Sequence, residues 1–224
     1  MFVVGKPALV IRGALIIADL HIGITRELYE SGISMPSQVR GMVDRIHELK
    51  KTTKAKHLVI LGDIKHKVPG TNWQELREVP ELLYAVRFKK ITIIKGNHDG
   101  NIERMVGEGV KVKKFMVIGE YLLTHGHRNA KTKKNIIIGH NHPHIKFRDK
   151  LGAIYTEPVW VRGKIKNSES RELIIMPAFN ELCGAVVVNQ DGFLGPIAKR
   201  IRDAHAFLLD GTDLGLIKDL KIRE

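Results

Sequence analysis

The sequence is poor in cysteine, in long apolar segments and in aromatic side chains. Its single cysteine, Cys183, excludes a disulfide framework and a zinc site built from cysteines. No apolar run reaches the roughly 18 residues that a membrane-spanning helix needs. Residues 1–12 also lack the basic stretch and long apolar stretch of a secretory signal. We therefore expect a cytoplasmic protein that does not associate with membranes.

Acidic residues are scarce relative to basic ones. The chain has 37 Lys and Arg against 24 Asp and Glu, a formal net charge of +13. Such a field attracts polyanions, and nucleic acid is the commonest of these. A lysine-rich thermophile surface, with glutamine only at Gln38, Gln74 and Gln190, explains the same composition equally well. Only 6% of residues are aromatic and no aromatic-plus-basic stacking pattern is evident, so backbone contact is favoured over base readout.

The apolar residues are arranged in short runs that alternate with longer amphipathic segments. Runs at 14–18, 57–61, 91–94 and 135–138 predict strands buried on both faces. Helices are predicted at about 36–51 and at 73–86, the second broken or bent at Pro80. This alternation is typical of a layered α/β fold. We expect one domain, residues 1–224.

The last third of the chain has a different pattern. From about residue 145 to 224 the runs are β-rich, with strands expected at 155–161, 172–176 and 185–189. Asp210-Gly211 between two apolar segments predicts a closing hairpin. We expect this portion to form a second sheet packed on the first.

Polar side chains that can bind metals directly follow the first four predicted strands and a fifth apolar run at 121–124. Because ligands bind at the carboxyl ends of strands in an open α/β sheet, these side chains are expected at one edge. Six of the eleven histidines fall between His98 and His144. The five segments are Asp19-Leu20-His21, Gly62-Asp63-Ile64-Lys65-His66, Gly96-Asn97-His98-Asp99, His125-Gly126-His127 and Gly139-His140-Asn141-His142.

This mixture of carboxylate, imidazole and amide groups suits divalent metals. A two-metal site needs a bridging ligand, and Asp63, in the middle strand of the set, is the natural one. Two ions roughly 3.5–4 Å apart clamp a phosphate and activate water, so the pattern predicts phosphoester hydrolysis. Each motif alone has a plainer explanation, such as a capped turn or a polar core histidine. The ordered set of five, each after a buried run, favours the metal site.

In these motifs the chain closely resembles the calcineurin-like metallophosphoesterase superfamily. The family pattern is Asp-x-His, Gly-Asp-x-x-(His/Asp), Gly-Asn-His-(Asp/Glu), a lone His and Gly-His-x-His, and it occurs in order between residues 19 and 142. The resemblance implies a two-sheet α/β sandwich with flanking helices and two divalent ions, manganese first, with iron, zinc, cobalt and nickel as alternatives. It implies one ion held by Asp19, His21, Asp63 and His142, and the other by Asp63, Asn97, His125 and His140.

The resemblance also implies catalytic roles. His98 would face the substrate as proton donor to the leaving group or as stabiliser of the phosphate, and Asp99 would orient its ring. Both His125 and His127 are available as the lone histidine of the pattern. His125 is preferred because it follows the strand directly and family members often have His-Gly at this point.

A narrower resemblance lies in residues 18–23 and 61–66. These segments are similar to small archaeal phosphoesterases related to SbcD nucleases, whose bacterial relatives are associated with DNA ligase and helicase genes. The resemblance implies a DNA or nucleotide substrate, a role in DNA repair, and a homodimer, since family nucleases often pair. His66 would lie either near the DNA or against a metal ligand. The basic loop that starts at His127 and Arg128 would hold flanking phosphates, or is merely solvated.

The sequence thus predicts a dinuclear metal-dependent phosphoesterase that hydrolyses phosphodiesters of DNA or a related nucleotide substrate. A phosphodiesterase or phosphatase for small molecules, such as a cyclic nucleotide or nucleotide derivative, is the enzymatic alternative. A non-catalytic scaffold of the same fold that binds partners is the alternative from another class.

Overall fold

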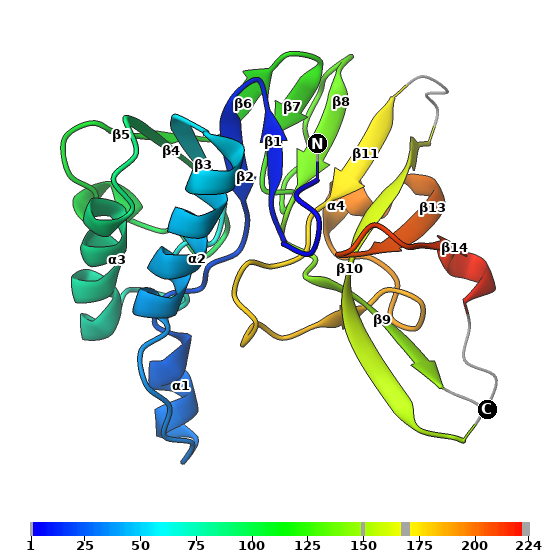
Figure 1. Ribbon diagram of the computed structural model, residues 1–224, viewed down its shortest axis with the longest axis horizontal. Coiled ribbons are helices and arrows are strands. Elements are labelled where there is room, and N and C mark those ends of the chain that lie inside the picture. The colour runs from blue at the N-terminus through cyan, green and yellow to red at the C-terminus, as the bar shows by residue number, and fades with distance from the viewer. Residues whose placement is uncertain (1, 149–150, 167–170, 221–224) are drawn as a thin grey trace.

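The apolar runs form the centres of two β-sheets that pack face to face (Figure 1). The computed structural model describes residues 2–148, 151–166 and 171–220. In the first sheet, β2 to β5 run parallel, and β1 lies antiparallel to β2 at one edge. In sheet order its strands are β1 (Leu9–Ile11), β2 (Ala14–Ile17), β3 (His57–Leu61), β4 (Lys90–Ile94) and β5 (Val110–Lys113).

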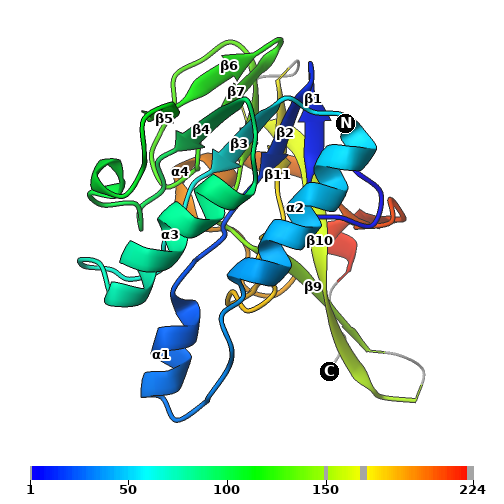
Figure 2. The ribbon, with the colours of Figure 1, turned by 60° about the vertical axis from the view of Figure 1, so that its left-hand side comes forward.

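Helices cover the outer face of the first sheet. Figure 2 shows α2 (Val39–Thr53) and α3 (Trp73–Ala85) side by side in front of the strands, and α1 (Ile24–Glu30) beyond them. The apolar stripe predicted for the first helix is buried on α2 at Val39, Met42, Ile46 and Leu49. Among the described residues, no helix is long and apolar enough to cross a membrane.

The second sheet is mixed and larger. Its central strands, β11 and β8, are parallel to each other, and β10 pairs antiparallel with β9, β11 and β13. In sheet order its strands are β12 (Val186–Val187), β9 (Pro143–Arg148), β10 (Ile154–Ile165), β11 (Glu172–Ile175), β8 (Asn135–Ile138), β7 (Tyr121–Leu123) and β6 (Met116–Ile118), with β13 (Ile201–Leu208) and β14 (Asp213–Leu216) attached to β10. The short elements are α4 (Gly195–Ala198), η1 (Ile102–Arg104) and η2 (Ile217–Asp219).

Alternation along the strands divides the core into three layers. On β2 and β3, Leu15, Leu58 and Ile60 face the helices. The intervening Ile16 and Val59 face the second sheet, where they join the fully buried Trp160. This is the period of two that a strand buried on both faces requires. A third layer lies on the outer face of the second sheet.

The predicted α/β two-sheet sandwich with flanking helices is confirmed, but the division of strands between sheets differs. The chain enters the second sheet at Met116, well before residue 145, so β7 and β8 belong to that sheet. β1, β5, β6 and β9 were not predicted, β13 begins earlier than the apolar segment of the predicted hairpin, and β12 is shorter than the expected strand at 185–189. The hairpin at Asp210-Gly211 is confirmed and joins β13 to β14. Short apolar runs predict strands but carry no information about which sheet they join.

The prediction that Pro80 breaks the second helix is wrong, because α3 runs through this residue. A capping box between Asn72 and Glu75 fixes the start of the helix. Pro80 and Leu76 both lie on the exposed face of α3. Because proline has no backbone N–H, the carbonyl of Leu76 lacks its helical hydrogen-bond donor. Water can satisfy that carbonyl, so the helix continues.

Replacing Pro80 by alanine is expected to stabilise the protein, because it restores the missing helix hydrogen bond at a solvent-exposed position. We expect the free energy of unfolding to rise by about 1–3 kcal/mol. Denaturant unfolding measures the change. The exposed neighbour Glu81→Ala is the matched control and should change stability little. A destabilised Pro80→Ala variant would contradict this explanation.

Candidate metal centre

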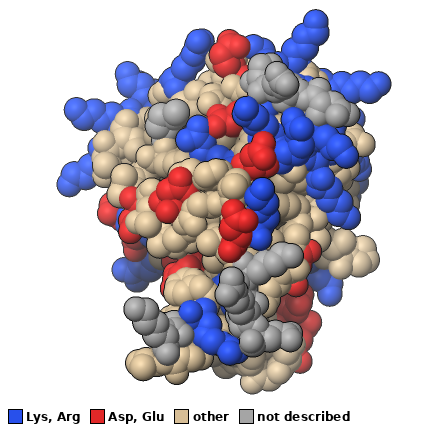
Figure 3. All heavy atoms as spheres, turned by 90° about the vertical axis from the view of Figure 1, so that its right-hand side faces the viewer, with Lys and Arg blue, Asp and Glu red and all other residues tan. Residues whose placement is uncertain are grey.

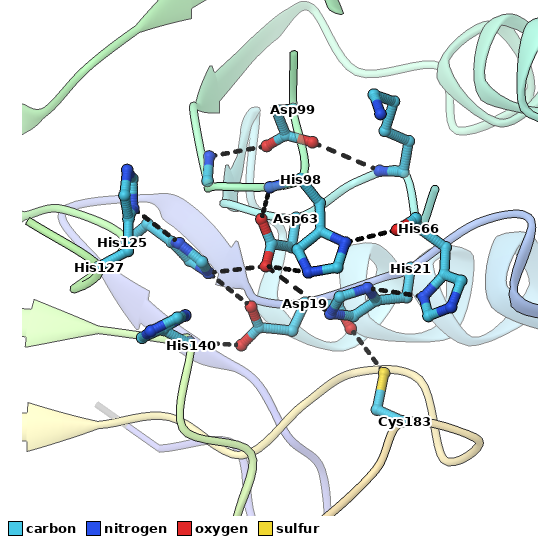
Figure 4. Close-up of polar contacts among 12 residues, drawn as sticks. Asp19, His21, Asp63, His66, His98, Asp99, His125, His127, His140 and Cys183 are labelled. Carbon is cyan, nitrogen blue, oxygen red and sulfur yellow. Dashed lines mark hydrogen bonds and ion pairs between the residues drawn. The ribbon is translucent and has the colours of Figure 1, made fainter. Parts of the chain in front are cut away.

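Six of the seven predicted metal ligands converge where strands of both sheets end. The strand ends belong to two facing sheets, not to one edge of a single sheet as predicted from the sequence. Figure 4 shows the side chains that it labels pointing toward one another from these loops. Asp19 and His21 follow β2, Asp63 follows β3, His125 follows β7, and His140 and His142 follow β8.

Asp63 lies at the middle of the group. Its Oδ2 is 3.4 Å from Nε2 of His125 and 3.8 Å from Nε2 of His21. Asp63 shares one set of donor atoms with Asp19 and His21 and another with His125 and His140; within each set the atoms lie within 4.8 Å of one another. Its carboxylate is thus common to two sets of donors, which is the arrangement that a bridging ligand requires.

Asp19 connects the two sides of the group. Its Oδ1 accepts a hydrogen bond from Nε2 of His125 at 2.9 Å and lies 3.7 Å from Nε2 of His142. Nε2 of His142 is also 3.3 Å from Nε2 of His21. The nitrogens that can bind a metal therefore point to the same spot as the carboxylate oxygens.

The backbone turns sharply at these residues. Ten described residues other than glycine have a left-handed φ, and five of them are predicted ligands. Such a conformation costs about 1–3 kcal/mol in a non-glycine residue, and it clusters at functional sites. The five are Asp19, His21, Asp63, His140 and His142, with φ between 40° and 69°.

The carboxylates are buried without a Lys or Arg side chain to compensate them. Among the described residues, no Lys or Arg side chain pairs with Asp19, Asp63 or Asp99. Burial, together with the charges of Asp19 and Asp99, raises the pKa of Asp63 to about 6. Lys65 is buried nearby, but its ammonium donates to the carbonyls of Lys67 and Gly70. The site therefore favours cations.

The histidines divide into two electrostatic types. Burial lowers the pKa of His21 to about 2 and that of His140 to about 4, so both rings are neutral and their lone pairs are free. Burial would also lower the pKa of His125 and His142. For these two, Asp19 and the neighbouring Asp63 together outweigh burial and raise the pKa. His125 and His142 thus keep a proton to higher pH than a free imidazole does.

His98 extends toward the same group from the loop after β4. Its Nε2 is 3.9 Å from Oδ2 of Asp63, and its side chain is 25% exposed. Its Nδ1 hydrogen-bonds the carbonyl of His66, which can only accept, so Nδ1 carries the proton. Nε2 is therefore the atom that a substrate can reach.

Asp99 has a different role from the predicted one. Its carboxylate accepts hydrogen bonds from the backbone N–H of Ile64 at 2.9 Å and of Gly96 at 2.8 Å, and the carbonyl of His66 orients the His98 ring. Asp99 thus joins the loops after β3 and β4. It positions Asp63 and His98 through the backbone.

The structure distinguishes His125 from His127 by their positions. His125 is fully buried against Asp19, and its Nδ1 lies 3.1 Å from Nδ1 of His127. Burial and the charges of His125 and Arg128 lower the pKa of His127 to about 4. His127 therefore lies behind His125, on the side away from the carboxylates (Figure 4).

The remaining predicted residues lie at the rim. His66 hydrogen-bonds Nδ1 of His21 at 3.2 Å and Glu27 at 2.9 Å, so its position favours the alternative of a residue that supports a metal ligand. Arg128 is exposed beside His127. Asn97 is exposed between two residues whose backbone N–H groups bind Asp99 and Asp63.

The loop that follows β11 begins with a segment, residues 177–180, to which the sequence assigned no chemical role. Phe179 donates its backbone N–H to the carbonyl of Ala18 at 2.8 Å, and Asn180 Nδ2 donates to that of Leu20 at 2.8 Å. This brings Cys183, for which the sequence predicted no metal-binding role, to within 4.8 Å of donor atoms of His21 and His142. Only the folded chain shows that proximity.

A family model for calcineurin-like phosphoesterases matches residues 14–176, the segment that carries all seven predicted ligands and His98. The chain belongs to the calcineurin-like phosphoesterase family. Membership implies a metal-dependent phosphoesterase. No curated protein matches the chain significantly.

Solved structures share the fold of this phosphoesterase. The crystal structure of the Pseudomonas putida nuclease MPE is similar with a TM-score of 0.61 and 22% sequence identity, over 91% of this chain and 88% of that one. The E. coli phosphoesterase YfcE gives a TM-score of 0.42 and 14% identity, over 90% of this chain and 96% of that one. At 22% identity the likeness to nuclease MPE shows the fold alone.

The residues present fit the divalent metals of the calcineurin-like phosphoesterases. Oxygen and imidazole donors lie within reach of one another, and the buried carboxylates lack a compensating cation. Carboxylate with imidazole suits manganese, iron, zinc and cobalt alike, so the donor set does not select one metal. Among the described residues, those that would hold such a metal are Asp19, His21, Asp63, His125, His140 and His142.

Gly96 is the position where a methyl group should damage the site most directly. A Cβ there would lie 1.9 Å from Oδ1 of Asp63 and 2.5 Å from its backbone nitrogen, so Gly96→Ala must displace Asp63. We expect less bound metal per chain, measured by elemental analysis, and a loss of about 1–3 kcal/mol in unfolding free energy. Gly100→Ala, with nothing within 4 Å, is the control and should match the wild type.

Metal uptake should release protons. Because the pKa of His125 and of His142 is raised, both rings bind more protons near neutral pH than free imidazole does, and a metal ion must displace them. We expect the calorimetric heat of metal binding at pH 7 to depend on the ionisation enthalpy of the buffer, and the number of released protons to fall at higher pH. A heat independent of the buffer would contradict these protonation states.

Proposed function

We propose that this phosphoesterase is a dinuclear enzyme that hydrolyses phosphodiester bonds in DNA or a related nucleotide substrate, in a DNA-repair setting. The observation that carries the proposal is the position of Asp63 in two sets of donors at once. Manganese is the first metal to test. The motif resemblance to SbcD-related phosphoesterases supports the nucleotide substrate.

Within this proposal, His98 supplies the proton for the leaving group. When bound, the pair of divalent ions supplies charge stabilisation at the phosphate and a nucleophile drawn from water. The carbonyl of His66 keeps the proton of His98 on Nδ1, so a second proton on Nε2 makes the ring an acid that faces the site. Asp99 keeps the loop of His98 in place through Gly96 and Ile64.

The positive charge of the surface supports a polyanionic substrate, but it does not show where on the surface the substrate lies. Figure 3 shows Lys and Arg crowding the upper part of one face, with Asp and Glu scattered among them. A net charge of +13 raises the rate of encounter with nucleic acid in a manner that salt weakens. A small nucleotide derivative needs no such field.

The experiment that tests the proposal is hydrolysis by metal-reconstituted protein. Bis-p-nitrophenyl phosphate, p-nitrophenyl phosphate and end-labelled single-stranded and duplex DNA are compared. Mn²⁺-dependent cleavage of the model diester and of DNA is expected. Cleavage of the diester with DNA intact would favour the small-molecule alternative. A metal-loaded protein that turns over no phosphoester would favour the scaffold alternative.

Removal of the His98 imidazole should separate catalysis from metal binding. We expect His98→Ala to lower turnover by roughly 10²–10⁴-fold and to leave metal content unchanged, because a general acid is lost and no ligand is. His205→Ala, on β13, is the matched control and should behave as the wild type. Loss of metal from His98→Ala would contradict the assigned role.

Asp63→Asn should lose bound metal, whereas His98→Ala should keep it. Replacing Asp63 by Asn preserves the shape of the side chain but removes the shared charge, so both metal positions should be emptied or weakened together. An intact two-metal site in this variant would contradict the bridging assignment.

A further inference from the structure

A cleft of about 420 Å³ lies directly beside the metal centre. Gly96 lines it and also lies against the carboxylate of Asp63, where a Cβ would be 1.9 Å from Oδ1. His127 also lines it and contacts His125 from the far side (Figure 4). Gly96 and His127 thus form a wall that the cleft shares with the metal centre.

Two segments from different sheets build the cleft. The turn between β5 and β6 supplies Lys114 and Phe115, and the loop after β7 supplies Arg128 and Lys131. Leu122 of β7 adds apolar surface. Because β5 ends one sheet and β6 ends the other, the fold brings together an aromatic and several cations. No such pattern is evident along the sequence.

The charged residues of the cleft are all basic. Lys114, Arg128 and Lys131 are exposed, and among the described residues none has a carboxylate within 4.0 Å. Lys95, by contrast, is paired with Glu103 at 2.7 Å. Three uncompensated positive charges beside a phosphate-binding site favour a ligand that carries further phosphates.

Phe115 distinguishes a nucleotide from a simple polyphosphate. Its side chain is 59% exposed among these cations, so a flat apolar partner would bury surface that the fold leaves in water. A base stacked on an aromatic ring is such a partner. The cleft volume falls in the range of about 300–1,000 Å³ that suits one small ligand. A space of this size is suited to one nucleotide, and stacking on Phe115 requires a base whose face is free.

We infer that this cleft binds one unpaired nucleotide of a nucleic-acid strand, next to the phosphate at the metal centre. Phe115 stacks on the base, and Lys114, Arg128 and Lys131 contact the flanking phosphates. The inference rests on the proposed phosphodiesterase function and adds a preference for single-stranded segments over duplex.

Binding measured without turnover tests the cleft. The full chain, kept in EDTA to prevent cleavage, is titrated into a labelled single-stranded oligonucleotide and into a blunt duplex of the same sequence, with fluorescence anisotropy as the readout. We expect tighter binding of the single strand. Phe115→Ala should weaken it roughly 5- to 100-fold, as for other base–aromatic stacks, and Phe115→Trp should restore it.

The phosphate contacts have a separate signature. Lys114→Ala and Arg128→Ala should each reduce the slope of log affinity against log salt concentration by about 0.7, the value for one contact to a single strand. Tyr84→Ala and Lys51→Ala, an exposed aromatic and an exposed cation on α3 and α2, are the matched controls and should bind as the wild type. Thermal unfolding verifies that every variant is folded.

The outcomes separate this inference from the proposed function. If wild-type protein hydrolyses the model diester but Phe115→Ala binds the single strand as well as the wild type does, the cleft assignment is wrong and the proposed function stands. Equal affinity for duplex and single strand also overturns the assignment. If no metal supports hydrolysis while the variants lose binding as expected, the nucleotide site stands and the proposed function is wrong.

Discussion

The buried carboxylate of Asp63 is the group on which the rest of the site depends. It accepts the backbone N–H of His98 at 2.9 Å, and it lies 3.4 Å from His125. It therefore links the loops after β3 and β4 of the first sheet with the loop after β7 of the second. The carboxylate of Asp63 can occupy this position because Gly96, which lies against it, has no Cβ. A small movement of this carboxylate would change both sets of donors and the position of His98 together.

The buried negative charge of the site lowers the stability of the folded protein. Three carboxylates are buried there, and the nearest groups that can carry a compensating charge are His125, beside Asp19 and Asp63, and His142, beside Asp19. Left-handed backbone at five ligand positions adds strain. Buried charges are tolerated when they are paired or coordinate metals. Metal binding therefore stabilises the folded state by mass action, and strain and burial together keep the donors preorganised.

The metal centre and the adjoining cleft divide the task of recognition. The donors at the strand ends act on the phosphate, which is common to every phosphoester. The turn between β5 and β6 and the loop after β7 surround the next part of the ligand with three cations and one ring. A general positive field brings polyanions to the surface, and the cleft then decides which of them fit.

The sequence alone determined the α/β class, the strands around residues 14–17, 57–61 and 135–138, and the chemistry of the residues that follow them, because buried runs and the motifs after them are local. It predicted that Asp63 would be central, and the distances support this. Tertiary structure decided what depends on distant segments meeting. Examples are the assignment of β7 and β8 to the second sheet, the contact of Asp99 with backbone instead of the His98 ring, and the approach of Cys183 and Phe115 to the site. Local patterns cannot specify these, since each depends on packing between elements far apart in the chain.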